Sequence, residues 1–177
     1  MGKYQVGDQA ADFVFDTPDQ TGIHFKDIAK NDKNIFVFLR YLGCSLCQLD
    51  IALFKKEYEN IVKKGGNLYI VLQSPQSTML PVKDQFPFPF VCDPEGKLYE
   101  LFGIEPAPSK EKMIGLKTMK KVGQAKLMGF SHGAYEGNEL QLPAAFIFKN
   151  DGTITYAHYG KTVDDAASPK TIVKLLG

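Results

Sequence analysis

The chain has 177 residues, 44% of them hydrophobic and 23% charged, which is the composition of an ordinary globular protein long enough to bury a substantial core. Twenty-one cationic and twenty anionic side chains leave a formal net charge of +1, which argues against a general attraction to nucleic acid or acidic membranes. Three cysteines are too few, and odd in number, for a disulfide scaffold. We expect a single domain over residues 1–177.

The sequence also bears on the compartment. Met1 to Val6 has no apolar core of the kind that marks a signal peptide, and no apolar run approaches the roughly 18 residues of a membrane span. We therefore expect a cytoplasmic protein. In a reducing compartment a single Cys-x-x-Cys motif is more often catalytic than structural.

The first thirty residues predict a small β-hairpin followed by a helical turn. Residues 11–15 and 23–25 have strand composition, and the turn-forming residues 17–19 lie between them. Residues 26–30 then predict one turn of helix.

A buried strand and a long helix come next, and the Cys-x-x-Cys motif of residues 44–47 lies between them. Residues 35–39 are consecutive apolar side chains, mostly β-branched or aromatic, which predicts a strand buried on both faces. Apolar side chains then recur at steps of three to five over residues 46–61, with charged residues between them, as in a surface helix. Gly65 follows the last turn as a stop signal.

This position has a chemical consequence for Cys44 and Cys47. The first turn of a helix has unpaired backbone N–H groups and the positive end of the helix dipole, so a thiolate there is stabilised and its pKa falls. One cysteine can then attack a substrate and the other can resolve the product into a disulfide. A structural zinc site normally needs four ligands, and the sequence has no second Cys-x-x-Cys and no His-x-x-x-His.

The middle of the chain continues the alternation of strands and helices. Residues 67–72 predict a strand, which with the preceding strand and helix makes a βαβ unit. Ser74-Pro75 opens a short helix, and the proline-rich stretch after it predicts a short strand over residues 89–92. Asp93 is a good helix cap, which predicts a helix from there to Gly103.

Residues 109–129 form a second run of helical spacing, with apolar residues among six lysines. We interpret it as a solvated helix face rather than a nucleic-acid or membrane surface, because no aromatic residues are interleaved with the lysines. Residues 129–142 are rich in glycine and polar side chains and predict a surface loop.

The last third of the chain predicts a β-hairpin and a closing helix. Residues 143–148 and 153–159 are the two strands, and Ser168-Pro169 caps a helix that ends near residue 176. Together the elements predict an α/β protein with a central mixed sheet flanked by helices. With a Cys-x-x-Cys motif after the first core strand, the expected architecture is the thioredoxin-like fold.

Four segments, in this order along the chain, resemble the redoxin group of AhpC/TSA-type, peroxiredoxin-like proteins. They are residues 7–13, 38–47, 90–97 and 142–148, and the second of them is similar to a branch that has Cys-x-x-Cys. The resemblance implies that Pro143 is a cis-proline facing the cysteines. Tyr41, on the loop before Cys44, is a second candidate for a position facing the substrate.

The same resemblance leaves the identity of the nucleophile open. A gapless match to the peroxiredoxin motif puts the attacking cysteine at Cys47, but most of the expected peroxide-binding groups are then replaced, with Arg40 at the proline position and Cys44 at the threonine position. Arg40 is a candidate substitute for the arginine that is lost. A match to thioredoxin makes Cys44 the nucleophile and Cys47 the resolving thiol, and the missing peroxide-binding groups favour this second assignment.

Two main functions remain at this stage. The first is a thiol–disulfide oxidoreductase, acting on peroxide or on disulfides, that is regenerated by a cellular dithiol such as a thioredoxin system and needs no metal or organic cofactor. The second is a redox-sensing module that binds a partner and does not turn over. A third, disfavoured hypothesis is metal binding by the motif together with Cys92 or His132. Cys92 is interpreted instead as a buried apolar side chain.

Overall fold

The computed structural model describes residues 3–177. Residues 1 and 2, which belong to the segment considered above as a possible signal peptide, lie outside the described residues. Its strands are β1 (Val14–Phe15), β2 (Ile23–His24), β3 (Asn34–Phe38), β4 (Asn67–Leu72), β5 (Phe90–Cys92), β6 (Ala144–Phe148) and β7 (Ile154–Tyr159). Its helices are α1 (Phe25–Ile28), α2 (Ser45–Lys63), α3 (Gln76–Met79), the 3₁₀ turn η1 (Lys83–Gln85), α4 (Lys97–Leu101), α5 (Lys110–Met113), α6 (Thr118–Leu127) and α7 (Pro169–Leu175). None of these helices combines the length and the apolar character that crossing a bilayer requires.

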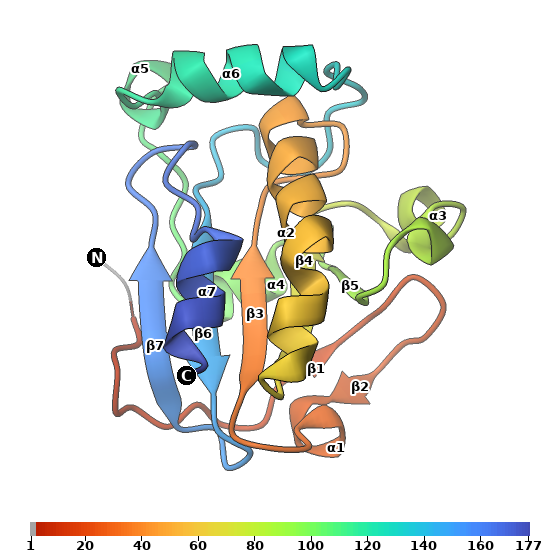
Figure 1. Ribbon diagram of the computed structural model, residues 1–177, viewed down its shortest axis with the longest axis vertical. Coiled ribbons are helices and arrows are strands. Elements are labelled where there is room, and N and C mark those ends of the chain that lie inside the picture. The colour runs from red at the N-terminus through yellow and green to blue at the C-terminus, as the bar shows by residue number, and fades with distance from the viewer. Residues whose placement is uncertain (1–2) are drawn as a thin grey trace.

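A five-stranded mixed sheet forms the centre of the protein, in the order β5-β4-β3-β6-β7 (Figure 1). β3, β4 and β5 are parallel, whereas β6 runs antiparallel to β3 and β7 antiparallel to β6. In the register, Phe38 at the end of β3 lies between Val71 and Ala144. This is the predicted mixed sheet, with the βαβ unit and the C-terminal hairpin in their predicted places.

Each face of the sheet is covered by its own apolar cluster. On one face, alternate residues of β3 such as Ile35 and Val37 pack with α2 and α7. On the other face, Phe36 and Phe38 pack with the β1–β2 hairpin and with α4. Because β3 is central and buried on both faces, its end is held rigidly, and the Cys-x-x-Cys motif follows directly from it.

Two helix predictions need correction. The helix expected from Asp93 starts only at Lys97, because Asp93 accepts hydrogen bonds from the backbone N–H groups of Lys97 and Leu98 (3.0 and 2.8 Å) after a turn at Gly96, whose φ is +71°. The single helical run expected over residues 109–129 is broken into α5 and α6. The loop at 129–142 has the predicted irregular structure.

Candidate active site

The Cys-x-x-Cys motif lies where β3 leads into α2, as the sequence predicts. Cys44 is the N-cap residue of α2, with extended backbone angles, and its Sγ accepts a hydrogen bond from the backbone N–H of Cys47 at 3.3 Å. The thiol therefore occupies the place that a serine or aspartate side chain takes in an ordinary helix cap. A negative charge on Cys44 is favoured there by the helix dipole.

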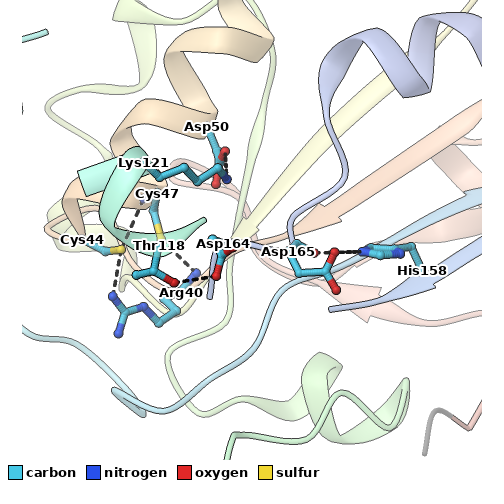
Figure 2. A network of polar contacts seen from close by, with 9 residues as sticks. All are labelled: Arg40, Cys44, Cys47, Asp50, Thr118, Lys121, His158, Asp164 and Asp165. Atoms are coloured by element: carbon cyan, nitrogen blue, oxygen red, sulfur yellow. Dashed lines mark hydrogen bonds and ion pairs between the residues drawn. The ribbon is translucent and has the colours of Figure 1, made fainter. Parts of the chain in front are cut away.

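Arg40 contacts both cysteines (Figure 2). Its Nη2 donates to the Cys44 Sγ at 3.1 Å, and its backbone N–H donates to the Cys47 Sγ at 3.4 Å. Its Nη1 donates to the carbonyl oxygen of Glu139 at 2.6 Å, and its Nε is buried without a hydrogen-bond partner. The guanidinium is thus fixed beside Cys44 from one side and tied to a distant loop on the other.

The two thiols have pKa values shifted in opposite directions. The hydrogen bond from the Cys47 thiol and the positive charge of Arg40 lower the pKa of Cys44 to about 6, although burial acts in the opposite direction. Burial raises the pKa of Cys47 above its ordinary value. At neutral pH the arrangement is a thiolate at Cys44 with a protonated thiol at Cys47, and neither cysteine is in a disulfide.

Both sulfur atoms are shielded from solvent. Cys44 is 0% exposed and Cys47 is 4% exposed. Residues 130–141, which we call the covering segment, contact the chain on both sides of Cys44. The backbone N–H of Gly133 donates to the carbonyl of Gly43 at 2.7 Å, and the Gln48 side chain donates to the carbonyl of Ser131 at 3.1 Å.

Glu136 anchors the covering segment to the loop after β4 and to α3. Its carboxylate accepts hydrogen bonds from the hydroxyls of Ser74 and Thr78, each at 2.7 Å. The Gln73 side chain is bonded to the backbone of Asn138 through both its amide nitrogen and its oxygen. These side-chain bonds join segments about sixty residues apart, and the covering segment is therefore held in place without regular secondary structure.

Tyr41 lies beside the thiols but its hydroxyl is directed to the covering segment. The ring is 0% exposed, the hydroxyl is hydrogen-bonded to His132 Nε2 at 3.0 Å, and the Tyr135 ring is 6.0 Å away. Burial raises the pKa of Tyr41, so the phenol remains protonated. The Arg40 guanidinium lies 5.3 Å from the centre of the Tyr41 ring.

The peptide bond before Pro143 is trans, so the expectation of a cis bond there is wrong. Pro143 is buried directly before β6, and its carbonyl accepts a hydrogen bond from the Gly160 N–H at 2.8 Å. It lines a cavity of about 450 Å³ together with residues 103–108 and the end of β7.

A second cavity, of about 460 Å³, adjoins the motif and is mostly apolar. Its walls come from α2, from residues 78–86 and from the covering segment, which contributes Phe130. Gly43 is part of the wall, so the cavity reaches the residue next to Cys44.

Cys92 and His132 do not extend the site into a metal centre. Cys92 is buried at the end of β5, where burial raises its pKa to about 12, in keeping with the predicted apolar role. Within residues 3–177 no group of three or more histidine, cysteine or acidic side chains is arranged to hold a metal ion.

Sequence reasoning missed three features around the thiols. The first two are hydrogen bonds from the covering segment: His132 bonds to Tyr41, and the Glu139 carbonyl bonds to Arg40. The third is the buried ion pair between Asp50 of α2 and Lys121 of α6, at 2.8 Å. Only the i, i+3 step from Cys47 to Asp50 signalled that an acid shares the helix face of the motif.

Several solved structures with this fold are named as peroxiredoxin-type or thiol:disulfide interchange proteins. The peroxidoxin BcpB from Mycobacterium tuberculosis has a TM-score of 0.69 at 13% identity, with 97% of this chain and 95% of that chain covered. AhpC from Enterococcus faecalis gives 0.68 at 16% identity (97% and 89%). A putative thiol:disulfide interchange protein DsbE from Chlorobium tepidum gives 0.59 at 17% identity (98% and 99%). These similarities establish the thioredoxin-like fold. No curated protein matches the chain in sequence.

The fold and the thiol pair together define a thioredoxin-fold redoxin. Residues 6–157 match the AhpC/TSA family, which is most of the chain, and the protein therefore belongs to that family. It is an oxidoreductase of the peroxiredoxin and thioredoxin-like class, as the sequence resemblance implied.

Proposed function

We propose that this protein reduces small hydroperoxides, with Cys44 as the nucleophile and Cys47 as the resolving thiol. The observation that carries the proposal is the 3.1 Å contact between Arg40 Nη2 and the Cys44 Sγ, at a thiolate whose pKa is about 6. A thiolate beside a fixed guanidinium is a reactive nucleophile at neutral pH. The same guanidinium is within reach of an oxygen that approaches the sulfur.

The chemistry needs only the two thiols and an external reductant. The Cys44 thiolate attacks one peroxide oxygen, so an S–O bond forms, the O–O bond breaks and the leaving alkoxide or hydroxide takes up a proton. The Cys44 sulfenic acid then reacts with the Cys47 thiol, which forms the disulfide and releases water. A dithiol returns two electrons by thiol–disulfide exchange, and family membership supports a thioredoxin-type donor for this step.

Burial favours a small substrate over a protein disulfide. A disulfide in a folded protein must bring its sulfur in line with the attacking thiolate, which requires an accessible thiol. The Cys44 sulfur is 0% exposed beneath neighbouring residues, and the covering segment is bonded on both sides of it. A hydroperoxide group needs a much smaller opening.

Serine variants test the proposal directly. We expect Cys44→Ser to abolish peroxide consumption, and Cys47→Ser to complete one turnover and accumulate a sulfenic acid that dimedone traps. Cys92→Ser is the matched control and keeps wild-type activity. Wild-type rates for both motif variants would refute the proposal. Faster reduction of insulin disulfides than of peroxide would replace it with a disulfide reductase.

A redox sensor predicts a different time course. A sensor is oxidised once and shows negligible steady-state flux, whereas the proposed peroxidase turns over repeatedly when a thioredoxin system is present. Peroxide consumption far above one equivalent of protein distinguishes the two.

A further inference from the structure

The outer face of α6 and its flanking residues carry the most exposed large apolar side chains of the described chain. Leu116 and Leu127 are 105% and 91% exposed, and Met119 is 75% exposed. Thr118 and Ala125 are buried, on the opposite face of the helix. Met119, Gly123 and Leu127 recur at four-residue steps and therefore form one outward stripe.

Lysines surround this stripe. Residues 110–128 contain six lysines and one glutamate, which leaves the rest of the chain with fifteen cationic and nineteen anionic side chains. Lys121 is paired with Asp50, but Lys117, Lys120 and Lys126 are exposed. The protein is thus nearly neutral as a whole and strongly cationic at this one end.

The structure changes the interpretation of this segment as a solvated helix face. Leu116 and Leu127 are almost fully exposed and Met119 is 75% exposed, so the outer face of this segment is apolar as well as cationic. In Figure 1, α6 lies as a ridge across the N-terminal end of α2, at one end of the molecule, with its outer side turned away from the sheet.

We propose that the α6 ridge, residues 114–128, binds the surface of an anionic lipid membrane. The apolar stripe enters the headgroup region while the exposed lysines contact anionic headgroups, which is the combination that interfacial helices use. This inference does not depend on the peroxidase activity, because no thiol takes part in it.

Other occupants fit the ridge less well. A second copy of this chain would bring two cationic ridges together, which is repulsive. Nucleic acid offers no partner for exposed leucines, and residues 110–128 contain no aromatic side chain for base stacking. A protein partner would need a groove shaped to this ridge, whereas a fluid bilayer adapts to scattered apolar and cationic side chains.

Vesicle sedimentation of the full chain tests the proposal. We expect the wild type to sediment with vesicles of phosphatidylcholine containing phosphatidylglycerol, to bind pure phosphatidylcholine far less, and to lose affinity as salt is added. Each lysine removed should weaken binding about fivefold, so Lys120→Glu/Lys126→Glu should weaken it by at least roughly thirtyfold, because the charges are reversed and not only removed. Leu116→Ser/Leu127→Ser should weaken it by about tenfold.

A charge-matched control separates this site from general attraction. Lys56→Glu/Lys63→Glu reverses two exposed lysines in the C-terminal half of α2, whereas α6 lies across the N-terminal end of that helix, and should leave vesicle binding unchanged. Cys44→Ser should also bind normally, so a failure of the peroxidase proposal leaves this one intact. Circular dichroism confirms that each variant is folded.

Three results would overturn the proposal. They are no sedimentation of the wild type with either vesicle, equal loss of binding in the α2 control, and concentration-dependent self-association that the α6 variants abolish. The last result would assign the ridge to a second copy of the chain.

Discussion

At the residue scale, the ionisation of Cys44 is the property that the proposed chemistry depends on most. A free cysteine titrates near 8.5, whereas the pKa of Cys44 lies at about 6. We expect the thiolate absorbance, and the rate of alkylation by iodoacetamide, to rise with a midpoint near pH 6. Cys92 stays silent below pH 10 because burial raises its pKa to about 12. A single midpoint above 8 would contradict this account.

Removing Arg40 should raise that midpoint. Arg40→Met deletes both the positive charge and the Nη2–Sγ hydrogen bond, and a nearby opposite charge typically shifts a pKa by about one to three units. We expect the pKa of Cys44 to rise by at least about one unit and peroxide consumption at neutral pH to fall accordingly. Arg40→Lys keeps the charge but not the planar fork and should be intermediate. An unchanged midpoint in Arg40→Met would exclude Arg40 from activating the thiol.

The hydrogen bond from Cys47 is the first-ranked cause of the low pKa of Cys44, so its loss should also raise that pKa. Cys47→Ala removes the side-chain donor and should raise the pKa of Cys44. Cys47→Ser retains a hydroxyl donor and should keep a low midpoint. Titration of the two Cys47 variants side by side makes this comparison, and identical midpoints would refute it.

At the scale of elements, the sequence was informative where a strand or helix is determined by its own residues. The apolar run of β3 and the spacing of α2 predicted both elements and the motif between them. The helix after Asp93 was misplaced because the carboxylate reaches past Pro94 and Gly96 to cap a later turn. At the break between α5 and α6, the Thr118 hydroxyl accepts a hydrogen bond from the Gly115 N–H and donates one to Asp164, forty-six residues away.

In the candidate site, too, only the residues that are close together in the sequence were predictable. Cys44, Cys47 and Arg40 lie within one short segment, and the structure brings them together. His132, Glu136 and Glu139 contact the site from a loop without periodicity, fifty-eight to ninety-nine residues from their partners, so no local pattern could indicate them.

The contact between Gly43 and the covering segment makes access to the thiols testable. A Cβ at residue 43 would lie 2.9 Å from the Ala134 nitrogen and from the Gly133 carbonyl carbon, which are backbone atoms that must move. We expect Gly43→Ala to displace the covering segment and to raise the reaction rate of Cys44 with the bulky disulfide DTNB by about tenfold or more, as local opening becomes less costly.

Gly123→Ala is the matched control for this experiment, because a Cβ there meets nothing within 4 Å. It should leave the DTNB rate unchanged and raise stability by up to about 1 kcal/mol through better helix propensity. Equal DTNB rates in wild type and Gly43→Ala would mean that the covering segment does not limit access to Cys44.

At the scale of the whole molecule, the ion pair between Asp50 and Lys121 connects the two regions to which functions are proposed. Asp50 is buried one turn after Cys47 on α2, and Lys121 reaches it from α6, so the pair joins the helix of the site to the cationic ridge (Figure 2). Burial raises the pKa of Asp50 while Lys121 acts to lower it. The carboxylate therefore depends on this one cation for its charge.

Lys121→Met should destabilise the protein by about 3 kcal/mol at neutral pH, because it leaves a buried carboxylate without its partner. Because the folded-state pKa of Asp50 lies above its unfolded value, the folded state binds the proton more tightly, and stability rises as the pH falls through the folded pKa. The deficit of Lys121→Met should accordingly shrink as the pH falls through the raised pKa of Asp50, because the buried carboxyl is then neutral. Urea unfolding at several pH values measures it.

The double variant Asp50→Asn/Lys121→Met provides the control. It removes both charges, so it should recover most of the lost free energy of unfolding at neutral pH and show a weaker dependence on pH than Lys121→Met. Lys120→Met, on the exposed side of α6, should change the free energy by less than about 0.5 kcal/mol. If Lys121→Met is as stable as wild type at neutral pH, Asp50 finds solvent or another partner, and α6 is not held on α2 by this pair.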